Sequence, residues 1–292
     1  MRRLVILAAL GLVAAACGGG GDDGTLTLEE GGITPIPGNS ELVVGPNRFA
    51  LALIDVDNRP ILEEPGTSVL LRFFFEDELK FEQDASFTWA IPDANGFFAA
   101  SVDFDQAGQW QVEPVLTRDG EETGVRRFTF PVREESQYPD IGDPAPPSAN
   151  LTLKEEPNIR RLSTDEEPEP ALYQMTVAEA LQAGKPLVVV FATPAFCQTR
   201  FCGPVVDNVE AMWQEYGDQG NFIHIEPFEL DAEGQLAAGA QGGPVVSAPM
   251  LEWQLQTEPW VFVVDADGRI AARFEGTASP DEIRDAIQAA LG

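Results

Sequence analysis

The chain has 292 residues, of which 44% are hydrophobic, and its formal net charge at pH 7 is -30. This length fits two ordinary domains with unstructured ends and linkers, and the hydrophobic content is enough to build a core in each. The strongly acidic charge excludes a role in binding nucleic acid or anionic lipid headgroups, because like charges repel.

The first residues have the pattern of an export signal. Two arginines precede an apolar run over residues 4–16, which is too short for a mature membrane span. The run ends in "VAAAC", which resembles a bacterial lipobox. The resemblance implies a signal peptide over residues 1–17, lipidation of Cys17 and an anchor on the extracytoplasmic face of the bacterial cell membrane. The alternative is an ordinary secretory peptide that is cleaved near Ala16.

The next residues predict a tether and then an all-β domain. Residues 18–40 begin with "GGGGDDG", which is typical of a flexible polar tether. Residues 41–133 contain seven short runs of β-forming residues separated by turn residues: "ELVVG", "RFALALID", "SVLLRFFF", "SFTWA", "GFFAASVDF", "GQWQVEPVL" and "RRFTFPV". Such runs predict an antiparallel β-sandwich. The domain contains neither cysteine nor histidine, so we expect no catalytic group in it.

One segment of this domain resembles a known fold family. "DQAGQW" (residues 105–110) is similar to the tyrosine corner of immunoglobulin-like domains, with Trp110 in the tyrosine position. The domain as a whole is also loosely similar to small extracytoplasmic β domains of the YtkA or FixH type.

Residues 134–170 are rich in proline and in acidic residues, which predicts an extended connector. From residue 171 to residue 292 the pattern changes to alternating helices and strands. A capping-box spacing at Thr176 starts a short helix, and "LVVVF" (187–191) is typical of a strand buried on both faces. A helix from about Val205, further strands, a hairpin turning at "DADG" and a C-terminal helix follow.

Cysteine usage singles out one pair. Of the three cysteines, Cys17 belongs to the predicted lipid anchor, which leaves Cys197 and Cys202 as an exclusive pair in a compartment where disulfides persist. The two residues lie in "FATPAFCQTRFCGPV", directly after the buried strand. The pair is a working thiol pair, a structural disulfide or part of a metal site.

The order of elements, with cysteines after the first buried strand, resembles the thioredoxin-like fold over residues 171–292. "FATPAFC" is similar to the Phe-Trp-Ala-x-Trp-Cys segment of thioredoxins. "TEPWVFVVDADGRIAARFEG" is similar to the family's cis-proline strand and hairpin, which makes Pro259 the candidate cis-proline facing the cysteines. The resemblance implies a lipid-anchored oxidoreductase that exchanges disulfides with exported proteins through Cys197 and Cys202. It implies no cofactor, but it requires an external redox partner.

The spacing of the cysteines leaves two assignments open, because thioredoxins have two residues between them and this chain has four. Alignment from Phe191 makes Cys197 the attacking thiol. Alignment on "FCGPV" makes Cys202 the attacking thiol, and the helix start after it favours this second assignment. Arg200, between the cysteines, would add positive charge that favours a thiolate. Val190 stands where many thioredoxins bury an aspartate that handles protons.

Two other functions remain open from the sequence. In one, the disulfide is structural, the thioredoxin-like domain is degenerate and the protein is a non-enzymatic binding protein. In the other, the protein is a Sco-like copper chaperone that uses Cys197, Cys202 and His224. Zinc or iron sites rich in histidine are excluded, because His224 is the sole histidine.

Overall fold

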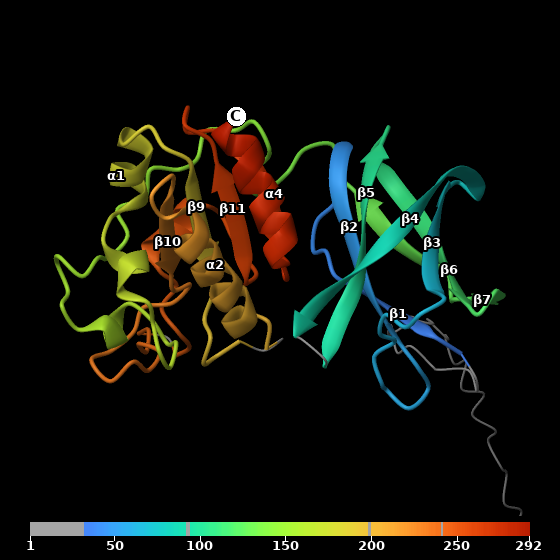
Figure 1. Ribbon diagram of the computed structural model, residues 1–292, viewed down its shortest axis with the longest axis horizontal. Helices are drawn as coiled ribbons and strands as arrows, with labels where there is room; N and C mark the ends of the chain where they lie inside the picture. The colour runs from blue at the N-terminus through green and yellow to red at the C-terminus, as the bar shows by residue number, and fades with distance from the viewer. Residues whose placement is uncertain (1–31, 92–93, 198–199, 241) are drawn as a thin grey trace, which may run out of the picture.

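The computed structural model describes residues 32–91, 94–197, 200–240 and 242–292. Figure 1 shows two lobes, a β-rich lobe formed by β1 to β8 and a second lobe in which helices flank a four-stranded sheet. The predicted signal peptide with Cys17 and most of the predicted tether lie outside the described residues. No helix within the described ranges is long and apolar enough to cross a membrane.

The strands of the first lobe form two layers joined by one long strand. They follow the order β1-β2-β5-β4-β3-β6-β7, and β8 pairs with β6. The first half of β4 pairs with β3 and its second half pairs with β5, so β4 passes from one layer to the other. The bounds are β1 (Thr34–Pro37), β2 (Gly45–Ile54), β3 (Thr67–Phe75), β4 (Glu78–Ile91), β5 (Asn95–Phe104), β6 (Gly108–Arg118), β7 (Glu121–Gly124) and β8 (Phe128–Val132).

The core between these layers follows from the alternation of side chains along each strand. On β2, Phe49 and Leu51 point into the core, and Phe98 and Val102 do the same on β5. Trp110 is fully buried, and its Nε1 donates a hydrogen bond to the carbonyl oxygen of residue 106 at 3.0 Å, as the resemblance to a tyrosine corner requires. The predicted antiparallel sandwich is therefore confirmed.

The outer face of the same layer is also apolar, which is unusual for a sheet surface. The residues that alternate with the core positions are small or aromatic, and they form a cluster of their own. We call this cluster the alanine face; it consists of Ala50, Ala52, Ala90, Phe97 and Ala99. An apolar surface opposite the core indicates that another part of the protein covers it.

The second lobe contains a mixed sheet of order β10-β9-β11-β12. β10 runs parallel to β9, whereas β11 is antiparallel to both β9 and β12. Helices α2 and α4 cover one face and α1 and α3 cover the other, which is why all five residues of β9 are buried. The bounds are α1 (Val177–Gln182), β9 (Leu187–Phe191), α2 (Cys202–Tyr216), β10 (Asn221–Ile225), α3 (Ala248–Glu252), β11 (Trp260–Val264), β12 (Ile270–Glu275) and α4 (Pro280–Leu291).

The predicted order of helices and strands in this lobe is confirmed, with one shifted boundary. The predicted capping box at Thr176 of α1 is present, and Ser279 forms a second capping box at the start of the predicted C-terminal helix, α4. The helix expected from about Val205 begins three residues earlier, at Cys202. Pro204 does not prevent this start, because the first turn of a helix requires no amide donor from its residues.

Part of the predicted tether and the predicted extended connector are packed against the lobes. β1 lies within the predicted tether and pairs with β2, so the first lobe begins before residue 41. The connector over residues 134–170 contains two 3₁₀ turns, Ile159–Arg161 and, at its end, Pro170–Tyr173. Ser148 and Asn150 of the connector are buried, and the amide of Asn150 accepts a hydrogen bond from the N–H of Val177. The many prolines of the connector prevent regular secondary structure, but the connector still packs against the second lobe.

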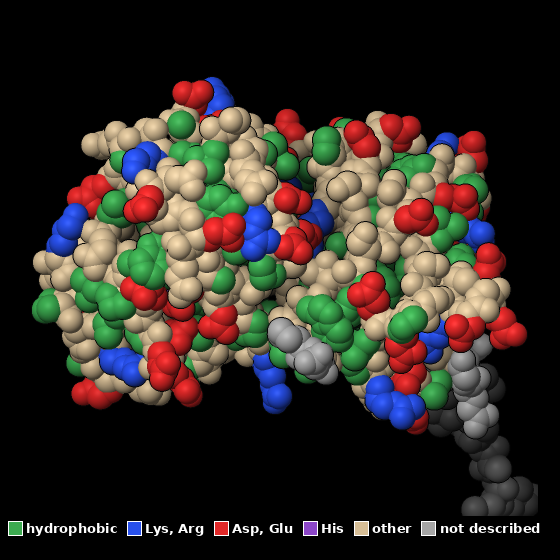
Figure 2. All heavy atoms as spheres, in the orientation of Figure 1, with side chains coloured by type: hydrophobic (Ala, Val, Ile, Leu, Met, Phe, Trp, Pro, Cys, Tyr) green, Lys and Arg blue, Asp and Glu red, His purple; other side chains and the backbone are tan. Residues whose placement is uncertain are grey.

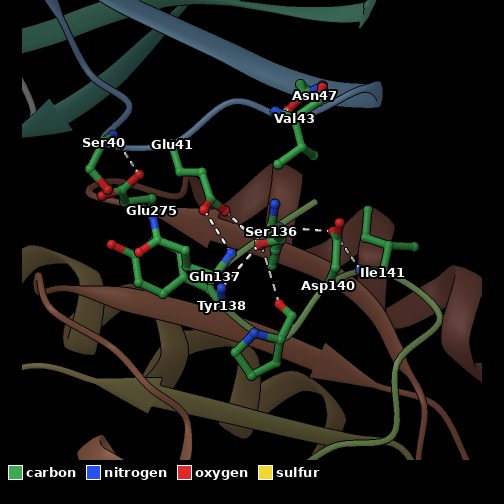
Figure 3. A network of polar contacts seen from close by, with 12 residues as sticks. Ser40, Glu41, Val43, Asn47, Ser136, Gln137, Tyr138, Asp140, Ile141 and Glu275 are labelled. Carbon is green, nitrogen blue, oxygen red and sulfur yellow. Dashed lines mark hydrogen bonds and ion pairs between the residues drawn. The ribbon is translucent and has the colours of Figure 1, made fainter. Parts of the chain in front are cut away.

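A polar network joins the two lobes where the connector begins (Figure 3). Glu41 of the first lobe accepts hydrogen bonds from the hydroxyl of Ser136 and, at 2.8 Å, from the N–H of Gln137. Arg273 of β12 donates to the same hydroxyl at 2.8 Å. The N–H of Ser40 donates to Glu275 at the end of β12. These contacts fix the edge strand of the second lobe against the first lobe.

A cleft of about 920 Å³ lies between the lobes, with acidic residues such as Glu82 and Glu282 on either side of it. Figure 2 shows acidic side chains spread over both lobes and a hollow between them. At the cleft, Arg48 of β2 makes two hydrogen bonds to the carboxylate of Glu282, at 2.6 and 3.1 Å. Its guanidinium also lies over the rings of Phe97 and Phe274, with ring centroids at 4.9 and 5.9 Å.

We predict that Arg48→Ala destabilises the protein by about 2 kcal/mol, because it removes two cation–π contacts and leaves a largely buried carboxylate unpaired. The side chains of Arg48 and Glu282 are only 16% and 25% exposed. The matched control is Arg59→Ala, whose ion pair with Asp55 lies within the first lobe and whose side chain is 70% exposed. The control should destabilise the protein much less, because water and salt screen an exposed ion pair. Urea unfolding measures both changes, and equal effects would contradict the prediction.

Candidate functional site: a disulfide at the start of α2

The predicted disulfide between Cys197 and Cys202 is present, with Cα atoms 5.9 Å apart. Cys197 lies in the loop that follows β9, and Cys202 is the first residue of α2. The buried strand and the helix therefore determine where each end of the pair lies.

The two sulfurs have different surroundings. Cys202 is fully buried in the core between the sheet and α2, whereas Cys197 is only partly buried. The N–H of Cys202 donates a hydrogen bond to Sγ of Cys197 at 3.3 Å. A helix N-terminus stabilises negative charge through its unpaired amides and its dipole, and lowers the pKa of a nearby thiol. The helix start therefore acts on the sulfur of Cys197.

The residues between the cysteines differ in what they contact. Arg200 is exposed and adopts the left-handed region with a φ of 65°, which non-glycine residues seldom adopt. Phe201 precedes the helix without a side-chain cap and packs against the alanine face of the first lobe. Of the described residues between the cysteines, Arg200 is thus exposed to solvent and Phe201 contacts the first lobe.

The predicted cis-proline lies at the same end of the sheet as the disulfide loop. The Glu258–Pro259 peptide bond is cis, as the resemblance implied. Trp260, the next residue, pairs with Phe191 at the end of β9, so Pro259 lies beside the start of the loop. Glu258 is partly buried, and burial raises the pKa of its carboxyl.

His224 is a buried residue of β10 that contacts the backbone directly after β9. Its Nε2 is 2.9 Å from the carbonyl oxygen of Ala192, and its Nδ1 is 2.6 Å from the hydroxyl of Tyr173. A proton on Nε2 satisfies both contacts, since Nδ1 then accepts from the hydroxyl. Burial lowers the pKa of His224 to about 4, which keeps the ring neutral.

These contacts of His224 argue against a copper site that uses its ring as a ligand. Both ring nitrogens of His224 already have protein partners. Within the ranges that the structure describes, no group of three His, Cys, Asp or Glu side chains is arranged to hold a metal ion. The geometry therefore does not bring Cys197, Cys202 and His224 together as a set of ligands.

A buried acid that the sequence analysis missed lies behind the disulfide loop. Glu226 follows β10 and is 6% exposed. Its Oε1 accepts hydrogen bonds from the N–H of Thr164, at 2.6 Å, and from the hydroxyl of the same residue. Burial raises the pKa of Glu226 to about 7, although the hydrogen bonds from Thr164 oppose the shift. A glutamate directly after an apolar strand was the only signal in the sequence.

Thr164 connects this acid to the disulfide loop. Its hydroxyl oxygen also accepts a hydrogen bond from the N–H of Ala195, two residues before Cys197. Thr193 of the same loop is fully buried and lies near Glu226 without the geometry of a hydrogen bond. Among the described residues, neither Oε2 of Glu226 nor the hydroxyl of Thr193 has a hydrogen-bond partner. Buried polar atoms seldom lack partners, so these two atoms are exceptions among the buried polar groups.

Comparisons with known proteins add the following. The chain matches no family model and no curated protein. Among solved structures it is similar to a thiol:disulfide interchange protein of the thioredoxin family from Chlorobium tepidum, with 16% identity and a TM-score of 0.33, over 54% of this chain and 99% of that one. It is also similar to a CARDB domain from Pyrococcus furiosus, with 11% identity and a TM-score of 0.23, over 37% of this chain and 100% of that one.

Proposed function

We propose that the protein is a thiol–disulfide oxidoreductase whose second lobe is a thioredoxin-like domain and whose first lobe is an immunoglobulin-like sandwich. The observation that supports this most strongly is the difference between the two sulfurs. The sulfur of the partly buried Cys197 accepts a hydrogen bond from a helix N-terminus, whereas Cys202 is fully buried. A purely structural disulfide has no need of this asymmetry.

Cys197 is the attacking thiol in this proposal, although the Gly-Pro sequence after Cys202 favoured the other cysteine. In the reduced protein, the Cys197 thiolate attacks a disulfide of the partner, which forms a mixed disulfide and releases one partner thiolate. The Cys202 thiolate then attacks Sγ of Cys197, which closes the internal disulfide and releases the second partner thiolate. Two electrons pass to the partner. The reverse sequence oxidises a partner dithiol.

Glu226 is the buried acid of the same proposal, because Val190 of β9 offers no carboxylate. The pKa of Glu226, raised to about 7 by burial, lets the carboxyl exchange a proton near neutral pH. Its bond to Thr164 couples it to the backbone of the disulfide loop. Glu226 is a positioning residue here, because its hydrogen bonds through Thr164 reach the backbone of the loop and not the sulfurs.

The partners and location follow from the N-terminal pattern. We propose an exported lipoprotein anchored through Cys17, which exchanges disulfides with exported proteins and an external redox partner. Cys17 cannot relay electrons to the pair once it carries lipid, and the chain has no other cysteine.

The reduction potential of the pair tests this function. We predict a value between about -120 and -270 mV, the range of exchange-active disulfides, and a value below about -300 mV would instead indicate a structural disulfide. The measurement uses the chain with Cys17→Ser, equilibrated with glutathione buffers, so that one pair titrates. The structural outcome would favour the second function, a binding protein with a degenerate thioredoxin-like domain.

A further inference from the structure

We propose that the first lobe sets the reactivity of the disulfide through Phe201, which acts as a positioning residue. The proposal rests on the proposed redox function, because it identifies a further residue that acts on the same pair. The sandwich would then be part of the redox site although it contributes neither cysteine nor histidine.

Phe201 is directly connected to the disulfide through the backbone. It lies within the loop that the disulfide closes, and the next residue is Cys202. Its ring packs on the alanine face, which includes the buried residues Ala90 and Phe97. The contact of this ring with the first lobe therefore anchors the backbone directly beside the N–H that donates to Cys197.

The alanine face is shaped to accept an aromatic ring. Core positions of β2 and β5 are filled by large side chains such as Leu51 and Phe98, but the outward positions of the alanine face include Ala50, Ala52 and Ala99. Small side chains let an aromatic ring from another lobe approach the sheet closely. In Figure 1, the hairpin of β4 and β5 extends toward the start of α2, where this contact is made.

Further contacts connect the alanine face rigidly to α2. Arg48 lies on the same outer face and holds Glu282, which also closes the capping box of α4. Helix α4 packs against α2, and the amide of Asn208 in α2 donates to the carbonyl of Ala278. The alanine face is therefore held in a fixed position relative to the helix that starts at the disulfide.

The energetic consequence follows from linkage. If contact with the alanine face stabilises the loop in its oxidised form, loss of the contact must favour reduction by the same free energy. Phe201→Ala removes the ring and leaves the sandwich core unchanged. Ala90→Asp places a charge under the ring from the opposite lobe, more than a hundred residues away in sequence.

The test measures the equilibrium of the pair with glutathione in the Cys17→Ser background. We expect Phe201→Ala and Ala90→Asp each to shift the equilibrium constant at least fivefold toward the dithiol, which equals roughly 20 mV. Phe201→Leu should recover most of the change. Ser68→Asp, at an exposed position of β3 in the other layer of the sandwich, is the control and should leave the constant unchanged.

An unchanged constant in Phe201→Ala would overturn the proposal, as would a shift toward the disulfide. Urea unfolding of the same variants separates this result from misfolding, and Phe201→Ala remains informative if Ala90→Asp fails to fold. The redox function fails separately, if the potential of the unsubstituted pair lies below about -300 mV.

Discussion

Replacing Cys202 with serine is expected to leave Cys197 joined to glutathione in a stable mixed disulfide, and replacing Cys197 with serine is expected to abolish exchange. Cys197 is only partly buried, and its sulfur accepts the hydrogen bond from the helix start. Cys202 is fully buried, so a partner sulfur reaches it only through Cys197. Mass spectrometry of each variant after incubation with glutathione disulfide measures the adduct.

Both variants carry Cys17→Ser, so that each has a single thiol. We expect the adduct to form at least about tenfold faster in Cys202→Ser than in Cys197→Ser, because accessibility and thiolate stabilisation both favour Cys197. The reverse order of rates would assign the attack to Cys202, as the Gly-Pro alignment had favoured.

Replacing either of two buried titratable groups is expected to change the pH dependence of stability in opposite directions. Relative to the unsubstituted protein, Glu226→Gln should lose unfolding free energy as the pH falls from about 7 to 4.5. His224→Gln should gain it as the pH falls from about 6.5 to 4. Each change should amount to up to about 3 kcal/mol, since one pKa unit corresponds to about 1.4 kcal/mol.

The signs follow from the pKa values in the folded and unfolded chain. Burial raises the pKa of Glu226 from 4.5 to about 7, so the folded protein binds this proton first and its stability rises as the pH falls through that window. Burial lowers the pKa of His224 from 6.5 to about 4, so the unfolded chain binds that proton first and stability falls. Asp165 acts on both groups and favours protonation of each.

In the unsubstituted protein these two contributions oppose each other between about pH 4.5 and 6.5. Urea unfolding at several pH values measures them, and the comparison uses differences from the unsubstituted protein because the many surface acids contribute a common background. Parallel curves for all three proteins would show that neither group is shifted as described.

The second lobe was the more predictable part of the fold. Capping boxes at Thr176 and Ser279 and the buried run of β9 depend on local chemistry, and the structure has all of them. The cis-proline was expected from the resemblance to the thioredoxin-like fold, and it is present too. The disulfide was predictable for a similar reason, because two cysteines in one loop had no other partner.

The contacts between distant segments were not predictable. Glu226 matters because Thr164, 62 residues away, folds over it. Phe201 is an ordinary aromatic residue in the sequence, and only the packing of the lobes places it on the alanine face. Alanines that alternate with core residues on β2 and β5 indicate a second apolar face, but not which segment covers it.

The alanine face and the pairing of Arg48 with Glu282 have a consequence for how the protein folds. A chain cut after residue 133 would expose Phe97 and its neighbouring alanines to water, and it would leave Arg48 without its carboxylate partner. We therefore expect the two lobes to unfold together as a single cooperative unit. Neither lobe is expected to fold independently when it is transferred to another protein.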